Sequence, residues 1–146
     1  MKKNIYLVIT FAVSLVGIVI FFGFPDLDII ILGIGAHRSF LFHSAIIPLV
    51  FFLVVLIFRT ELIKIILYSI CGSFCVAVGL HLFTDVFQKT AIKFPLIGSL
   101  VKGTSLDDRL WELGNMLLCL LLAFVLYRQL ARIIGRASGN TAGGKP

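Results

Sequence analysis

The sequence has few charged residues. Only 14% of its 146 residues are Asp, Glu, Lys or Arg, and only seven of them are acidic. Soluble domains carry about 25% charged residues. A chain with so little charge and 60% hydrophobic residues does not suit a water-exposed globular surface. The composition therefore excludes an ordinary soluble domain and predicts a membrane protein.

The sequence also lacks a basic helix or an aromatic and basic platform. Its net charge of +6 could suggest nucleic-acid binding, but the basic residues lie mainly between and beyond the apolar runs. That distribution is typical of signals that orient membrane helices. We therefore expect no nucleic-acid partner, and the lipid bilayer is the expected surrounding.

Cysteine is scarce. Cys71, Cys75 and Cys119 all lie inside apolar runs, and an odd number of such residues argues against a disulfide framework. Cys71 and Cys75 are four residues apart and would share a helix face. They are either small packing residues, which we favour, or a pair of ligands for a soft metal.

Four long apolar stretches are present, at residues 5–24, 40–58, 62–83 and 110–134. Spanning about 30 Å of hydrocarbon takes about 20 helical residues, so each stretch is long enough. The sequence predicts an all-α fold, a bundle of about four transmembrane helices formed by residues 1–134. Pro48 predicts a kink in the second helix, and residues 135–146 are expected to form a flexible tail.

The first stretch could be either a signal peptide or a retained helix. Its apolar region exceeds the usual length of about 7–15 residues, and no small-x-small cleavage site follows. We expect it to be retained.

The distribution of Lys and Arg predicts the orientation. With an even number of spans both termini lie on one side, which would hold eight of the thirteen basic residues. The positive-inside rule then places both termini of the multi-pass chain in the cytoplasm.

Three polar motifs interrupt the apolar pattern, at residues 25–28, 37–44 and 81–85. In the four-helix topology all three fall at the non-cytoplasmic face, and together they contain every histidine of the chain. His81 and Asp85 are four residues apart, which places them one turn apart on one helix face. We therefore expect the three motifs to converge.

The converging residue types predict a metal site. Carboxylates gathered at the membrane border repel one another unless a cation neutralises them. Imidazole and carboxylate together suit Zn²⁺, Mn²⁺ or Fe²⁺, and zinc is favoured here. The predicted ligands are Asp28, His43, His81 and Asp85.

Other polar residues near these ligands have expected roles. Asp26 and His37 are either ligands of a second metal or an acid and base pair, and Arg38 is either a phosphate clamp or an interfacial anchor. Ser44 is a helix cap or, less readily, a nucleophile. Asn115 either supports a ligand by hydrogen bonding or holds helices together.

The ordered motifs resemble those of the YdjM-like family. Pro25, Asp26 and Asp28 match its first motif, and the second and third motifs are matched by His37, Arg38, His43, Ser44, His81 and Asp85. The resemblance implies an inner-membrane metal-dependent hydrolase, and the family's founder carries a LexA-binding label. Residues 39–42 depart from the family's pattern, which puts the substrate contacts in question.

The sequence thus predicts a metal-dependent hydrolase that acts on a phosphoester or another ester of a membrane-associated substrate. A metal-binding membrane protein without catalysis, such as a transporter or sensor, is the main alternative. An adaptor for a soluble partner is a third possibility, and it would use the cytoplasmic tail.

Overall fold

The computed structural model describes residues 2–33, 38–88 and 105–139. These residues form five helices and no strand-built sheet, which confirms the all-α prediction. The helices are α1 (Lys2–Phe21), α2 (Leu27–Leu32), α3 (Ile46–Val55), α4 (Glu61–Asp85) and α5 (Ser105–Gly139).

Three of the helices are long and apolar enough to cross a membrane, and they cover Lys3–Phe21, Glu61–Asp85 and Arg109–Arg136. The chain is therefore a multi-pass membrane protein with three candidate spans. They correspond to the first, third and fourth apolar stretches of the sequence.

The second apolar stretch forms a shorter helix than the sequence predicts. Only the ten residues of α3 are helical, which is about 15 Å or half of the hydrocarbon thickness. Pro48 is the third residue of α3 rather than the centre of a longer, kinked helix. Proline is tolerated in the first turn, where its missing N–H has no helical acceptor, but a helix that began more than one turn earlier would lose a hydrogen bond at Pro48 and clash with its ring. The helix therefore starts at Ile46.

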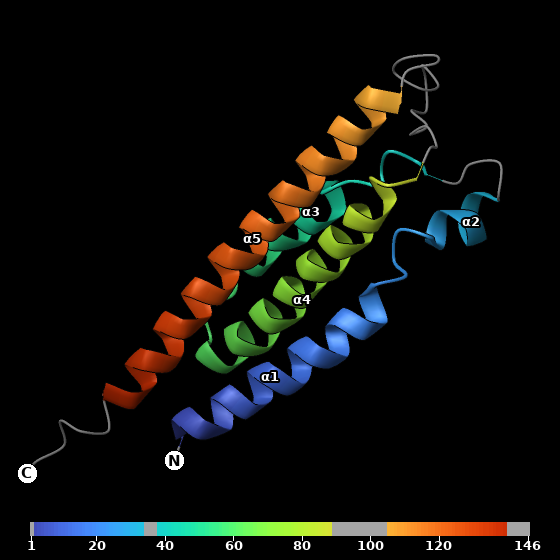
Figure 1. Ribbon diagram of the computed structural model, residues 1–146. Helices are drawn as coiled ribbons and strands as arrows, with labels where there is room; N and C mark the ends of the chain where they lie inside the picture. The colour runs from blue at the N-terminus through green and yellow to red at the C-terminus, as the bar shows by residue number, and fades with distance from the viewer. Residues whose placement is uncertain (1, 34–37, 89–104, 140–146) are drawn as a thin grey trace, which may run out of the picture.

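The long helices lie side by side, and α4 packs between α1 and α5 (Figure 1). The start of α1 and the end of α5 lie at one end of the bundle. The end of α4 and the starts of α3 and α5 lie at the other end, which we call the site end. The helix α5 continues to Gly139, five residues past the predicted boundary, and residues 140–146 lie outside the described part of the chain.

The interior consists of two apolar clusters arranged along α4. One contains Ile65, Tyr68 and Leu126 towards the terminal end of the bundle, and the other contains Phe74, Val78 and Leu82 towards the site end. This packing fixes the position of the last turns of α4 along the bundle axis, and so it positions His81 and Asp85.

The contact between α1 and α4 depends on Gly17. This residue is buried, and a Cβ atom there would overlap the Ser73 hydroxyl of α4. Small residues at helix contacts allow close backbone approach in membranes. Because α1 leads into the polar motif at residues 25–28, its packing against α4 affects the position of that motif.

We expect Gly17→Ala to destabilise the protein by about 1–3 kcal/mol, the usual cost of overpacking a close contact. Thermal unfolding in detergent micelles would measure the loss. Gly114→Ala is the matched control, because nothing lies within 4 Å of a Cβ atom at that helical position. Equal stability of the two variants would contradict the close contact.

Candidate metal centre

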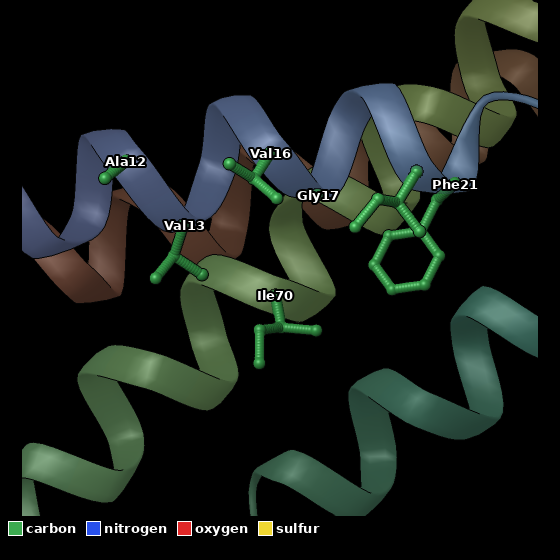
Figure 2. A pocket seen from close by; sticks show the side chains of 7 residues that line it. Ala12, Val13, Val16, Gly17, Phe21 and Ile70 are labelled. Atoms are coloured by element: carbon green, nitrogen blue, oxygen red, sulfur yellow. The ribbon is translucent and has the colours of Figure 1, made fainter.

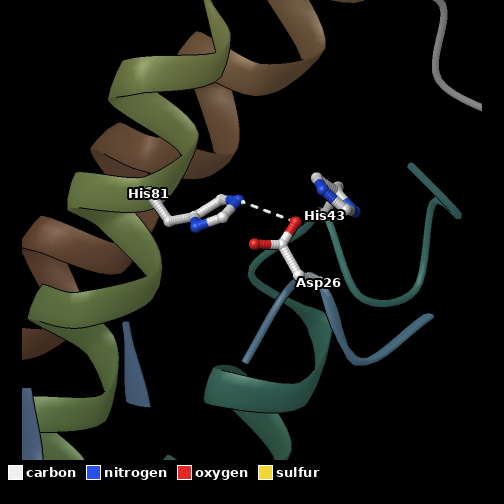
Figure 3. A group of neighbouring side chains, drawn as sticks. All are labelled: Asp26, His43 and His81. Atoms are coloured by element: carbon white, nitrogen blue, oxygen red, sulfur yellow. Dashed lines mark ion pairs between the residues drawn. The ribbon is translucent and has the colours of Figure 1, made fainter. Parts of the chain in front are cut away.

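Three separate segments place the polar residues at the site end. Asp26 precedes α2, His43 lies in the segment between α2 and α3, and His81 lies in the last turn but one of α4. Figure 3 shows these three side chains turned towards a common point. One ligand atom from each lies within 4.8 Å of the others, so Asp26, His43 and His81 could bind a metal ion.

His81 presents Nε2 to the site. Its other ring nitrogen, Nδ1, lies 2.9 Å from the carbonyl oxygen of Phe22. A carbonyl only accepts hydrogen bonds, so Nδ1 carries the proton of that contact. Nε2 lies 3.3 Å from Asp85 Oδ2 and 3.6 Å from Asp26 Oδ1.

His43 has the same arrangement with different partners. Its Nδ1 lies 3.2 Å from Asp28 Oδ2, and its Nε2 lies 3.5 Å from Asp85 Oδ2. The rings of His43 and His81 meet edge to face at a centroid distance of 5.7 Å. Both imidazoles therefore direct Nε2 to the same carboxylate oxygen.

These spacings suit a cation between the ligand atoms. Three of them are 3.3, 3.5 and 3.6 Å, beyond the usual 2.7–3.2 Å of an N–H···O bond. Tetrahedral ligands at zinc bond lengths of about 2.0–2.1 Å lie about 3.3–3.4 Å apart. A neutral imidazole whose Nδ1 carries the proton offers a lone pair at Nε2, which would face a carboxylate unfavourably without a cation between them.

The positions of Asp28 and Asp26 differ from those expected, because Asp28 was predicted to be a metal ligand and Asp26 was not in that ligand set. Asp28 is fully buried, faces Nδ1 rather than Nε2 of His43, and accepts a 2.9 Å hydrogen bond from the Ser39 amide. That is the place of a carboxylate that orients a histidine. Asp26 belongs instead to the group that could hold the metal, and its half-exposed side chain opens the site to the outside.

Arg38 is also placed differently from a phosphate clamp. Its side chain is only 2% exposed, and its Nη1 donates to Glu112 at 2.7 Å. Nη2 donates to Asp85 Oδ1 at 3.1 Å and to Gln88 Oε1 at 2.9 Å. These acceptors occupy both terminal nitrogens, so Arg38 holds Asp85 in place rather than reaching towards a substrate. His37 lies outside the described residues.

The segment that carries His43 is clamped by α5. Trp111 Nε1 donates to the His43 carbonyl at 3.1 Å, and Asn115 Oδ1 accepts from the Ala45 amide at 2.8 Å. Asn115 also donates to the Trp111 carbonyl. Of its two predicted roles, Asn115 therefore joins α5 to the start of α3. Ser44 accepts from the Ile46 amide, but the N-cap residue of α3 is Ala45 rather than Ser44.

Glu112 belongs to this cluster but was not among the residues predicted from the sequence. It is 1% exposed and forms the shortest ion pair with Arg38. A signal was present, because an acidic residue inside the apolar run of α5 is costly in a membrane unless it is paired. Its partner, 74 positions away in the sequence, could not be identified from local spacing.

Comparisons with protein-family models, with curated proteins and with solved structures found no match to this chain. The resemblance to the YdjM-like family therefore stays a hypothesis that depends on the three motifs.

We expect purified protein to bind a divalent metal at about one ion per chain, and His81→Ala to reduce the bound metal to background. Metal analysis after dialysis would measure this. Ser69→Ala in the same helix should keep wild-type metal content, because the Ser69 hydroxyl donates to the Ile65 carbonyl of its own helix. Asp28→Asn should weaken binding by about 10–100-fold rather than abolish it, as an orienting residue would. Unchanged metal content in His81→Ala would exclude the site.

We expect Glu112→Ala to cost about 3–5 kcal/mol of stability, because it leaves a buried guanidinium without its closest carboxylate. Glu112→Gln should cost less, since it keeps an acceptor for Arg38 Nη1. Chemical unfolding in detergent would compare the two. A loss below about 1 kcal/mol in Glu112→Ala would show that the pair is solvated rather than buried.

Proposed function

We propose that this protein is a membrane-embedded, metal-dependent hydrolase that acts on a phosphoester, or another ester, of a membrane-associated molecule. The observation that supports it is the convergence of His43 Nε2, His81 Nε2 and two carboxylates at the end of a membrane bundle, in a site that is buried except at Asp26. The motif resemblance described above depends on the same residues and agrees with this proposal.

The donor set favours a catalytic rather than a closed structural metal. Catalytic zinc sites use three protein ligands and keep one position open, whereas structural ones are commonly closed by cysteine. No cysteine belongs to the Asp26, His43 and His81 group. Zinc is therefore the favoured ion, with manganese or iron as alternatives.

A bound divalent cation would supply Lewis acidity and make a water molecule acidic enough to react near neutral pH. The chain's own residues would direct that chemistry. Asp28 and the Phe22 carbonyl fix the two imidazoles with Nε2 inward. Asp26, at the open side, is placed to hold the ion or to accept a proton from water.

Arg38 acts in this proposal as a positioning residue. It holds the Oδ1 atom of Asp85, which leaves Oδ2 directed at the two imidazoles. Substrate binding would then depend on the metal and on the membrane rather than on this guanidinium. We further propose that both termini are cytoplasmic, so the site lies at the opposite border of an inner membrane.

A non-catalytic role in moving metal ions is the second candidate. Below His81, α4 carries buried small residues with polar atoms on two different faces, with Ser69 and Ser73 on one and Cys71 and Cys75 on the other. The two serines, however, bond carbonyls of their own helix. These residues do not form one continuous polar path, so they favour transport less strongly than the site favours hydrolysis.

Wild-type protein loaded with zinc should release a water-soluble phosphorylated product from phospholipid in mixed micelles. His81→Ala should lower the rate at least about 100-fold, since even supporting partners of metal ligands contribute about 10–100-fold. The Ser69→Ala control should stay within about twofold of wild type. Absence of hydrolysis together with metal flux into liposomes would reject the enzyme and favour the transporter.

A further inference from the structure

An open apolar groove runs along α1 on the outside of the bundle. It has a volume of about 430 Å³. Figure 2 shows its border, in which side chains of α1 face Ile70 of α4. The lining on α1 includes Ala12, Val13, Val16 and Phe21.

A second pocket continues the groove towards the site end of the bundle. It has a volume of about 320 Å³ and shares Ile20 and Phe21 with the groove. Its other lining residues include Phe24 and Leu27, which flank Asp26 in the chain. The adjoining Phe22 contacts His81 through its carbonyl and through its ring, at a centroid distance of 5.5 Å.

The length of the groove matches one leaflet of a bilayer. Ala12 and Phe21 are nine residues apart, which is about 14 Å along a helix. Half of the hydrocarbon core is about 15 Å. The groove therefore starts near the middle of the membrane and ends where the polar residues begin.

From this continuity we infer that the groove binds one acyl chain of a phospholipid from the leaflet at the site end, with the headgroup phosphoester held at Asp26, His43 and His81. The inference rests on the proposed function and narrows its substrate to a phospholipid. The apolar groove and the candidate metal centre both suit the chemistry of such a ligand. The groove offers an almost wholly apolar wall, and a divalent cation at the site would attract the anionic phosphate.

The groove also explains how a substrate could reach a site that is mostly buried. The lipid would move along α1 within its own leaflet, so its apolar chain would never enter water. The exposed residue of the site is Asp26. It directly precedes Leu27, which lines the second pocket, and its Oδ1 lies 3.6 Å from His81 Nε2. A water-soluble phosphoester would gain none of this binding energy.

Two neighbouring residues of α1 provide a matched test. Leu15 is 55% exposed and Val16 is 56% exposed, but only Val16 lines the groove. Val16→Trp would fill the groove, whereas Leu15→Trp would add the same bulk on another face of the helix at nearly the same depth. Neither residue belongs to the candidate metal centre.

The first measurement does not depend on catalysis. Protein in phosphatidylethanolamine vesicles that contain a photoactivatable acyl-chain analogue is irradiated, and the adducts are located by mass spectrometry. Adducts should concentrate on the groove, including Ile70. Val16→Trp should lower the Ile70 adduct at least fivefold, and Leu15→Trp should change it less than twofold. Equal Ile70 adducts in both variants would overturn the acyl-chain site.

The second measurement separates the groove from the hydrolase proposal. Val16→Trp should lower kcat/KM for long-chain phospholipid about tenfold and leave both metal content and the hydrolysis of a short, water-soluble phosphodiester within twofold. Equal effects on the two substrates would overturn the groove and keep the hydrolase. No hydrolysis by the wild type, with Ile70 adducts as expected, would reject the hydrolase and keep the lipid site.

Discussion

The Asp85 carboxylate is the group on which the site end of this protein depends. One of its oxygens lies 3.1 Å from the Arg38 guanidinium, and the other lies 3.3 Å and 3.5 Å from the imidazoles of His81 and His43. A single side chain at the end of α4 thus joins the segment before α3 to the central helix. Through Arg38 it is also connected to Glu112 of α5. Removing its charge would disturb three segments at once.

The balance of charge around Asp85 explains why a cation suits the site. Four carboxylates lie there among the described residues, those of Asp26, Asp28, Asp85 and Glu112, and the Arg38 guanidinium pairs with two of them. Three of these acids are almost fully buried. Like charges in a medium of low dielectric constant repel strongly, and the repulsion falls when a cation lies among them. Arg38 neutralises the inner side, and a metal at the imidazoles would neutralise the outer side.

The backbone of Arg38 is conformationally strained. Its φ angle is 65°, in the left-handed region that residues other than glycine rarely adopt. Such a conformation costs about 1–3 kcal/mol and persists where the surroundings hold it. The contacts with Glu112, Asp85 and Gln88 provide that hold. The strained residue thus lies directly beside the candidate metal centre.

The sequence was sufficient to predict the helical class and the meeting of the three motifs. Three of the four apolar runs form candidate spans, and the pairing of His81 with Asp85 follows from helical spacing. The roles of Asp26 and Asp28 could not be separated, because two carboxylates two residues apart in a turn give no periodic signal. The length of α3 was overestimated, because hydropathy records apolar content but not the place where Pro48 allows a helix to begin.

The short α3 has a consequence for the surrounding lipid. From Val55 the chain returns to the terminal end of the bundle through residues 56–60, which are not helical. Peptide groups outside a helix need water or other polar partners and are not tolerated against hydrocarbon. Leu56, Ile57 and Phe58 are exposed there. Lipid headgroups and water would therefore have to reach inward beside this segment. The bilayer would then be locally thinner in the leaflet at the terminal end of the bundle, away from the histidines.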